Sequence, residues 1–137
     1  MTSTVEYKGE LRTVAIHERS GSQIETDAPA DNHGKGERFS PTDLIATALA
    51  SCILTTIGIL GKPQNIDIDG VTCQVEKIMV PNPRRIGEIK IVMNFPAGKS
   101  YSESQMAAIE HIALTCPVIE SLHPNCKKTL IFNWPNA

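Results

Sequence analysis

Apolar and polar positions along the chain follow several patterns, and these patterns separate strands from helices. The segments Val71–Met79 and Ile89–Phe95 alternate between apolar and polar residues, which is typical of half-buried strands joined here by the turn 81–85. Segments 5–8, 12–18 and 22–26 have strand-like composition and predict an N-terminal meander. A continuous apolar run at 44–60 instead predicts a long helix.

The ends of this helix are marked by capping residues. Ser40 is a good N-cap, Pro41 suits the first helical position, and Asp43 completes a capping box. Gly61 follows Leu60 and is a natural stop. The predicted helix measures about 30 Å. Because it is apolar nearly all round, we expect it to be buried on several sides.

A second helix and a closing strand are predicted in the C-terminal part. Ser102 and Gln105 stand at capping-box spacing at the start of the helical segment 102–115. Pro117 breaks this helix, and a short helical turn is expected to follow as far as Leu122. Lys127–Trp134 reads as a final strand, whereas 27–38 reads as a loop.

Composition narrows the class of protein. A length of 137 residues predicts a single domain over 1–137, and a net charge of −2 with scattered basic residues gives no nucleic-acid footprint. The first residues lack a signal-peptide pattern, so a cytoplasmic location is expected. The apolar run 44–60 is shorter than the roughly 20 residues of a membrane span, and we expect no membrane association.

Four cysteines in a reducing compartment indicate thiols, redox pairs or ligands rather than structural disulfides. Cys52 lies in mid-helix among apolar residues, where its pKa should rise, so local physics favours a core cysteine. A reactive Cys52 would need a cation, and Arg12 and Arg19 are the candidates. Cys116 precedes Pro117 at an expected N-cap, where backbone amides favour a thiolate.

The remaining cysteines have less distinctive settings. Cys73 shares a strand face with Val71 and is most simply a core residue, and Cys126 lies in a loop. A zinc site built from His111, Cys116, His123 and Cys126 is an alternative, but the spacing matches no familiar finger pattern. We expect no metal.

Two motifs carry a family resemblance: Ser40-Pro41-Thr42-Asp43-Leu44 leading to Cys52, and Cys116-Pro117. With them, nearly the whole chain resembles the OsmC/Ohr family of thiol-dependent hydroperoxide reductases. The resemblance implies an α+β fold in which antiparallel sheets from two chains wrap two central helices. It also implies an intertwined homodimer whose sites use residues of both chains.

The resemblance further implies the roles of the site residues. Cys52 would be the peroxidatic thiol, Cys116 the resolving thiol, and an arginine the cation, for which we choose Arg12 over Arg19. The substrate would be an organic hydroperoxide and the reductant an external dithiol, with no metal, flavin or nucleotide as cofactor. An apolar wall favouring alkyl peroxides is expected from four side chains: Phe39, Ile45, Leu49 and Ile53.

One position departs from the family pattern. The family typically places a glutamate that orients the arginine where this chain has Thr42. Asp43 points to the opposite helix face from Cys52, so Glu37 and Glu120 are considered as substitutes. The departure keeps an alternative open: a non-enzymatic protein that binds a small apolar ligand or senses oxidants.

Overall fold

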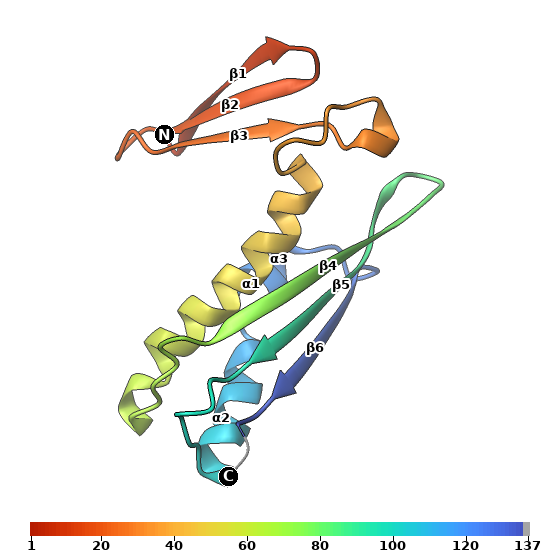
Figure 1. Cartoon of the computed structure of the whole chain (residues 1–137). Helices are drawn as coiled ribbons and strands as arrows, with labels where there is room; N and C mark the ends of the chain where they lie inside the picture. Colours follow the sequence, from red (N-terminus) through yellow and green to blue (C-terminus); the bar gives the residue numbers. More distant parts are fainter. Residues whose placement is uncertain (136–137) are drawn as a thin grey trace. The chain divides into compact units, whose positions relative to one another are not determined.

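A computed structural model describes residues 1–135 (Figure 1). The chain divides into two compact units, Met1–Ile45 and the part from Ala46 onward. The predicted single domain over 1–137 stays a prediction.

The first unit is built on a three-stranded antiparallel sheet in the order β1-β2-β3, as the predicted meander requires. Its strands are β1 (Ser3–Gly9), β2 (Arg12–His17) and β3 (Gln23–Asp27). The register aligns Val5 with Ala15 and Ala15 with Ile24, so these apolar residues share one face of the sheet. A loop with one 3-10 turn (Ala30–Asn32) follows β3.

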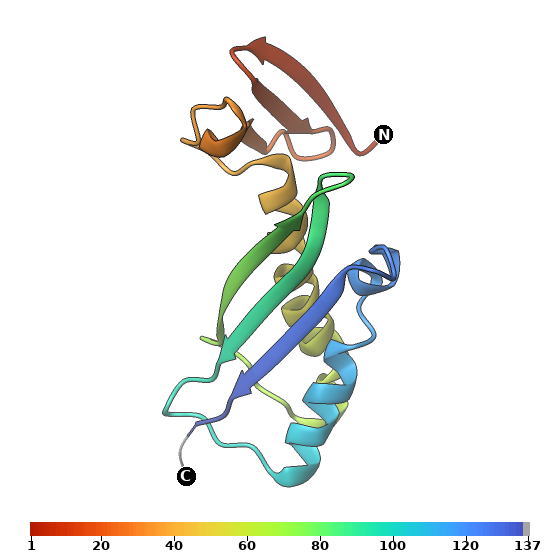
Figure 2. The same ribbon diagram turned by 90° about the vertical axis from the view of Figure 1, so that its right-hand side faces the viewer.

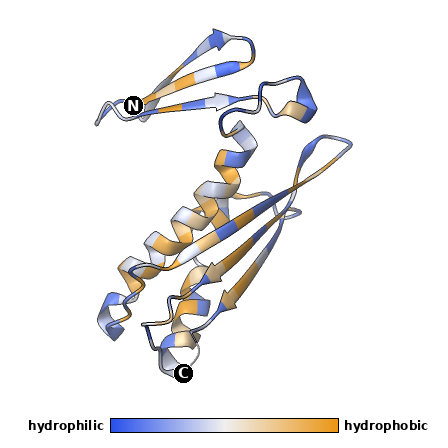
Figure 3. Ribbon diagram, in the orientation of Figure 1, coloured by the Kyte–Doolittle hydropathy of each residue, from blue (hydrophilic) through white to orange (hydrophobic). Residues whose placement is uncertain are grey.

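Helix α1 (Pro41–Leu60) begins and ends at the predicted residues. The Asp43 backbone N–H donates to Ser40 Oγ (3.0 Å), and the Ser40 N–H donates to Asp43 Oδ2 (2.9 Å), which completes the capping box. At the other end, the Gly61 N–H still bonds to the Ile57 carbonyl, and a second 3-10 turn (Lys62–Gln64) follows. Figure 3 shows that apolar residues line most of this helix.

The second unit contains a mixed sheet in the order β4-β5-β6. Strands β4 (Thr72–Val80) and β5 (Arg85–Asn94) form the predicted hairpin. Strand β6 (Lys127–Asn133) pairs parallel to β5, so the expectation of antiparallel sheets was wrong for this pair of strands. The connection contains α2 (Glu103–Ala113), which starts with the predicted Ser102 capping box, and α3 (Pro117–Ser121).

Helices α1 and α2 cover one face of this sheet (Figures 1 and 2). The core between them holds these fully buried side chains: Leu49, Ile53 and Ile57 of α1; Ile89, Ile91 and Met93 of β5; Ile109 and Ala113 of α2. The α+β class is confirmed, with aliphatic side chains forming most of the core.

Helix α1 is not buried on several sides within this chain, contrary to expectation. Ile59 is 63% exposed and Leu60 is 50% exposed, because the sheet and α2 cover only one face of the helix. By length and composition alone α1 could cross a membrane, but the core helix of a soluble protein has the same properties.

Candidate functional site

Cys52 lies in the middle of α1 and is half-buried. Burial is the largest influence on its pKa and acts to raise it. Hydrogen bonds from the Val118 backbone N–H, the Cys116 thiol and the Thr56 hydroxyl together outweigh burial, so the pKa of Cys52 lies below its ordinary value. The Thr56 oxygen is 3.9 Å from the Cys52 sulfur, one helical turn away. The expectation that the apolar surroundings of Cys52 raise its pKa was therefore wrong.

Cys116 is the N-cap of α3, as predicted, and its sulfur accepts a hydrogen bond from the Ile119 N–H at 3.4 Å. The side chain is nevertheless completely buried. Burial raises the pKa of Cys116, the Ile119 N–H opposes this, and the neighbouring Cys52 sulfur raises the pKa further. The prediction that the backbone amides of this helix start lower the pKa of Cys116 was therefore wrong, because burial outweighs them.

Each thiol shifts the pKa of the other: Cys116 lowers the pKa of Cys52, and Cys52 raises the pKa of Cys116. The more exposed of the two thiols is therefore the one with the lowered pKa. Such a pair can pass from an oxidised sulfur on Cys52 to a disulfide without a third group. All four cysteines are free thiols.

Arg12 belongs to the first unit, and its pairing with Cys52 stays a prediction. Its guanidinium forms a two-point ion pair with Asp27, whose carboxylate lies 2.7 Å from Nε and 2.8 Å from Nη2. Asp27 was not expected in this role, because residues 27–38 were predicted to form a loop. The signal that could have found it is strand register, since Arg12 and Asp27 are cross-strand partners. Arg19, the other candidate, is exposed in the turn after β2.

The proposed substitutes for the family glutamate have different settings. Glu37 Oε1 lies 3.8 Å from Arg12 Nη2, so this carboxylate is near the guanidinium but does not form the two-point pair. Glu120 lies exposed on α3 in the other unit. Asp43 caps α1, as predicted.

A further expectation concerns an apolar wall beside Cys52. Leu49 and Ile53 are fully buried in the core, so the expected apolar wall for a substrate was wrong for these two residues. An open hollow of about 440 Å³ instead lies against α2 and β6, lined by Glu110, Leu114, Lys128, Leu130 and Phe132.

Cys73 is half-buried, and burial raises the pKa of its thiol. Cys126 is buried beside the start of β6. Within residues 1–135, no three histidine, cysteine or acidic side chains gather closely enough to hold a metal ion.

Comparisons with known proteins bear on this arrangement. A family model described as OsmC-like protein matches residues 34–130. The structure is similar to that of an osmotic stress induced and detoxification response protein from Psychrobacter arcticus 273-4, with 48% sequence identity, a TM-score of 0.91, and coverage of 96% of this chain and 95% of that chain. No curated protein sequence matches the chain.

More distant solved structures share the fold. An organic hydroperoxide resistance protein OsmC from Legionella pneumophila is 16% identical, with a TM-score of 0.76 and 97% of each chain covered. The organic hydroperoxide resistance protein OhrB of Bacillus subtilis is 19% identical, with a TM-score of 0.67 over 96% of this chain and 98% of that chain. The predicted OsmC-like α+β fold is confirmed, and the chain belongs to the OsmC-like protein family.

Proposed function

We propose that this protein is a thiol-dependent peroxidase that reduces organic hydroperoxides through Cys52 and Cys116. The observation that carries the proposal is that Cys52 on α1 and Cys116 at the N-cap of α3 each shift the pKa of the other thiol, with the lowered pKa on the half-exposed Cys52. Two family members with the same fold are named organic hydroperoxide resistance proteins, which supports the choice of substrate.

The proposed reaction has three steps. Cys52 thiolate attacks the distal oxygen of the hydroperoxide, the O–O bond breaks, and the alkoxide takes up a proton and leaves as the alcohol. Cys52 is then a sulfenic acid, which Cys116 attacks through its sulfur to form a disulfide and release water. An external dithiol reduces the disulfide by thiol exchange and restores both thiols.

Arg12 is the proposed cation that stabilises the Cys52 thiolate and orients the peroxide. The protein is proposed to act in the cytoplasm and to need no metal or organic cofactor. A fixed guanidinium charge is suited to this task because it stays protonated at all physiological pH values.

We also propose that the protein is a homodimer. In the first unit, Val5 (61% exposed), Tyr7 (63%) and Ile24 (50%) leave one face of a three-stranded sheet uncovered. Such a sheet is marginally stable unless its apolar face is covered. In the second unit, Ile59 and Leu60 leave an apolar strip on α1 open to solvent. A second copy of the chain would cover both surfaces, and sedimentation of the Tyr7→Glu and Ile59→Glu variants as monomers would support this.

The peroxidase proposal is tested by adding one equivalent of cumene hydroperoxide, or of hydrogen peroxide, to the reduced protein and mapping its thiols by mass spectrometry. A rapid Cys52–Cys116 disulfide that forms faster with the organic peroxide is expected. Cys52→Ser should abolish peroxide consumption, and Cys116→Ser should let Cys52 proceed to sulfinic acid. Cys73→Ser is the matched control and should behave as the wild type.

Three outcomes would contradict the proposal or one of its steps. Unchanged peroxide consumption by Cys52→Ser would remove Cys52 from the reaction. Slow oxidation scattered over the cysteines, with Cys52 still a thiol, would favour a protein that binds a small apolar ligand. Resistance of Cys116→Ser to sulfinic acid formation would exclude a resolving role for Cys116.

A further inference from the structure

The guanidinium of Arg12 is held by a short, two-point ion pair inside the first unit. Arg12 on β2 and Asp27 on β3 are direct cross-strand partners. Nε donates to Oδ1 at 2.7 Å, and Nη2 donates to Oδ2 at 2.8 Å. Two parallel, charge-assisted hydrogen bonds fix the plane of a guanidinium as well as its position.

Asp27 is the anchored member of this pair. Its side chain is 1% exposed, whereas that of Arg12 is 25% exposed. Oδ2 also accepts a hydrogen bond from the Glu37 backbone N–H at 3.2 Å, and the Asp27 N–H donates to the Phe39 carbonyl at 3.1 Å. The carboxylate is therefore tied to the sheet on one side and to the following loop on the other.

One nitrogen of the guanidinium, Nη1, is available to bind a ligand. Among residues 1–135, Nη1 of Arg12 has no hydrogen-bond or ion-pair partner, although Nε and Nη2 are both engaged. An anion or a polarised oxygen arriving at Nη1 would meet a donor whose direction is already set. Such preorganisation avoids the cost of ordering a long side chain when the ligand binds.

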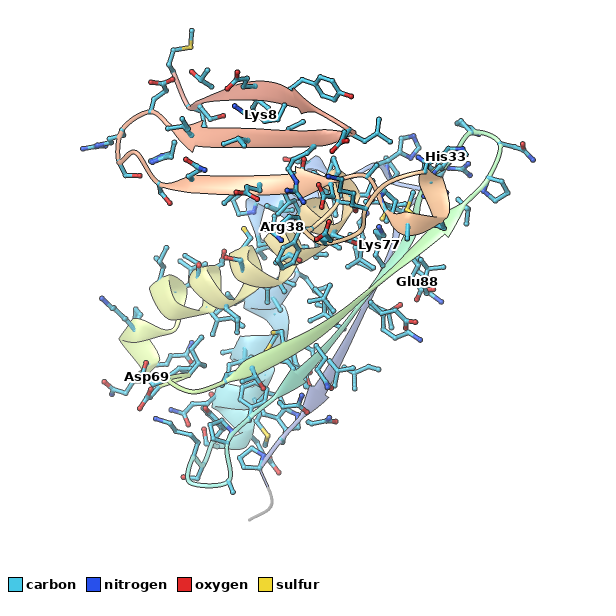
Figure 4. The ribbon with its side chains drawn as sticks, turned by 45° about the horizontal axis from the view of Figure 1, so that its top comes forward. Lys8, His33, Arg38, Asp69, Lys77 and Glu88 are labelled. Atoms are coloured by element: carbon cyan, nitrogen blue, oxygen red, sulfur yellow. The ribbon has the colours of Figure 1, made fainter. Side chains whose placement is uncertain are left out.

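The other carboxylates near Arg12 do not hold its guanidinium in the way that Asp27 does. Glu37 is 61% exposed, and its carboxylate is 3.8 Å from Arg12 Nη2. Glu25 lies two residues before Asp27 and is paired with Arg38 at 2.8 Å. Arg38, labelled in Figure 4, comes from the segment between β3 and α1.

Both members of the pair are charged at neutral pH. The hydrogen bonds with Asp27 raise the pKa of Arg12, burial opposes this, and Glu25 and Glu37 add smaller raising effects. The hydrogen bonds from Arg12 lower the pKa of Asp27 although burial acts to raise it.

We propose that Asp27 is the positioning residue for Arg12, and that it fixes the direction in which the free Nη1 edge of the guanidinium is offered to the peroxide. This inference rests on the proposed function, in which Arg12 is the cation. Asp27 would act only through the arginine and not by touching the substrate. The family pattern has its orienting carboxylate at the position of Thr42, which carries none in this chain. In this proposal, the Asp27 carboxylate on β3 takes over that task for Arg12 on the adjacent strand β2.

The test compares Asp27→Asn, Arg12→Gln and the double variant, with Glu25→Gln as the matched control on the same strand. Steady-state turnover of cumene hydroperoxide and the pH dependence of Cys52 alkylation are measured, with circular dichroism to check folding. Asp27→Asn should lower kcat/KM by about 10- to 100-fold, because misplacing a catalytic group by an ångström has an effect of this size. It should add nothing to Arg12→Gln, since both act through one guanidinium. Glu25→Gln should stay within about twofold of the wild type.

Asp27→Glu keeps the ion pair but displaces the guanidinium by the length of one methylene group. It is the variant to use if Asp27→Asn fails to fold, and it should lose at least about 10-fold in kcat/KM while remaining folded. A merely structural Asp27 would leave kcat/KM and the alkylation profile of folded Asp27→Glu unchanged, and this result would overturn the inference. Additive effects of Asp27→Asn and Arg12→Gln would overturn it too.

Failure of the inference can be separated from failure of the proposed function. If Arg12→Gln keeps full kcat/KM while Cys52→Ser is inactive, the thiol chemistry stands but the arginine and its positioning residue have no part in it. If Cys52→Ser keeps full activity, the proposed function itself is wrong.

Discussion

Leu49 separates a structural role from a substrate-binding role for the residues next to Cys52. The sequence suggested that it lines an apolar wall for peroxides, but its side chain is completely buried between α1 and the sheet. Leu49→Ala removes three carbon atoms, at about 0.8 kcal/mol for each buried methylene-sized group. The unfilled cavity adds to this loss, so the free energy of unfolding should fall by about 3–5 kcal/mol. Leu114→Ala is the matched control. Leu114 is 59% exposed, so the same truncation should cost about 1 kcal/mol.

The assay is urea unfolding at one fixed protein concentration, because any dimerisation makes stability depend on concentration. With an m-value of about 2 kcal/mol/M, the midpoint of Leu49→Ala should fall by roughly 1.5–2.5 M. The ratio of activities towards cumene hydroperoxide and hydrogen peroxide should change little in the folded variant. A variant that keeps its stability to within about 1 kcal/mol but loses its preference for the organic peroxide would refute the assignment of Leu49 to the core.

Three further results are expected. Iodoacetamide should label Cys52 before Cys116 as the pH is raised, because Cys52 is half-exposed with a lowered pKa and Cys116 is buried with a raised one; equal labelling in peptide mass spectra would contradict this. Ser102→Ala should lower the free energy of unfolding by about 1 kcal/mol, because α2 loses the side chain that caps it; an unchanged urea midpoint would argue against the cap. The lowered pKa of Asp27 means that its contribution to stability is complete above its ordinary pKa and is lost as the pH falls through the folded-state value. Asp27→Asn should therefore flatten the acid side of the stability profile measured by urea unfolding, and an unchanged slope would count against the ion pair.

The elements that could be predicted are those set by local interactions. Helix α1 was predicted with its bounds, because the capping box of Ser40 and Asp43 and the glycine stop at Gly61 all act within one helical turn. The N-cap of α2 at Ser102 follows the same rule. The hairpin β4–β5 could also be predicted, because its two strands follow one another in the sequence and are joined by a short turn.

Other features depend on contacts between distant segments. The parallel pairing of β6 with β5 requires the chain to return through α2 and α3. The alternation of apolar and polar residues along a strand is the same whether the strand pairs parallel or antiparallel, so it does not predict this direction. The partner of Arg12 was missed for a related reason. Asp27 lies at the end of β3, where composition suggests a loop, and only the strand register brings its carboxylate to the guanidinium.

The two thiols show how packing can reverse a local expectation. From neighbours in sequence alone, the backbone amides at the start of a helix should lower the pKa of Cys116. The apolar helix around Cys52 should raise the pKa of that thiol. In the fold, α3 offers its Ile119 N–H to its own cap, but its Val118 N–H also reaches Cys52, which in addition accepts from Cys116. Cys116 thereby becomes a donor in a buried position, and the thiolate is favoured on the more accessible sulfur. A nucleophile that faces solvent with its resolving thiol held protonated behind it is the order that the proposed reaction needs. Since these hydrogen bonds come from α3 and α1 alone, part of the activation of Cys52 should persist in Arg12→Gln. An alkylation profile for that variant that still places Cys52 ahead of Cys73 would separate the contribution of α3 from that of the arginine.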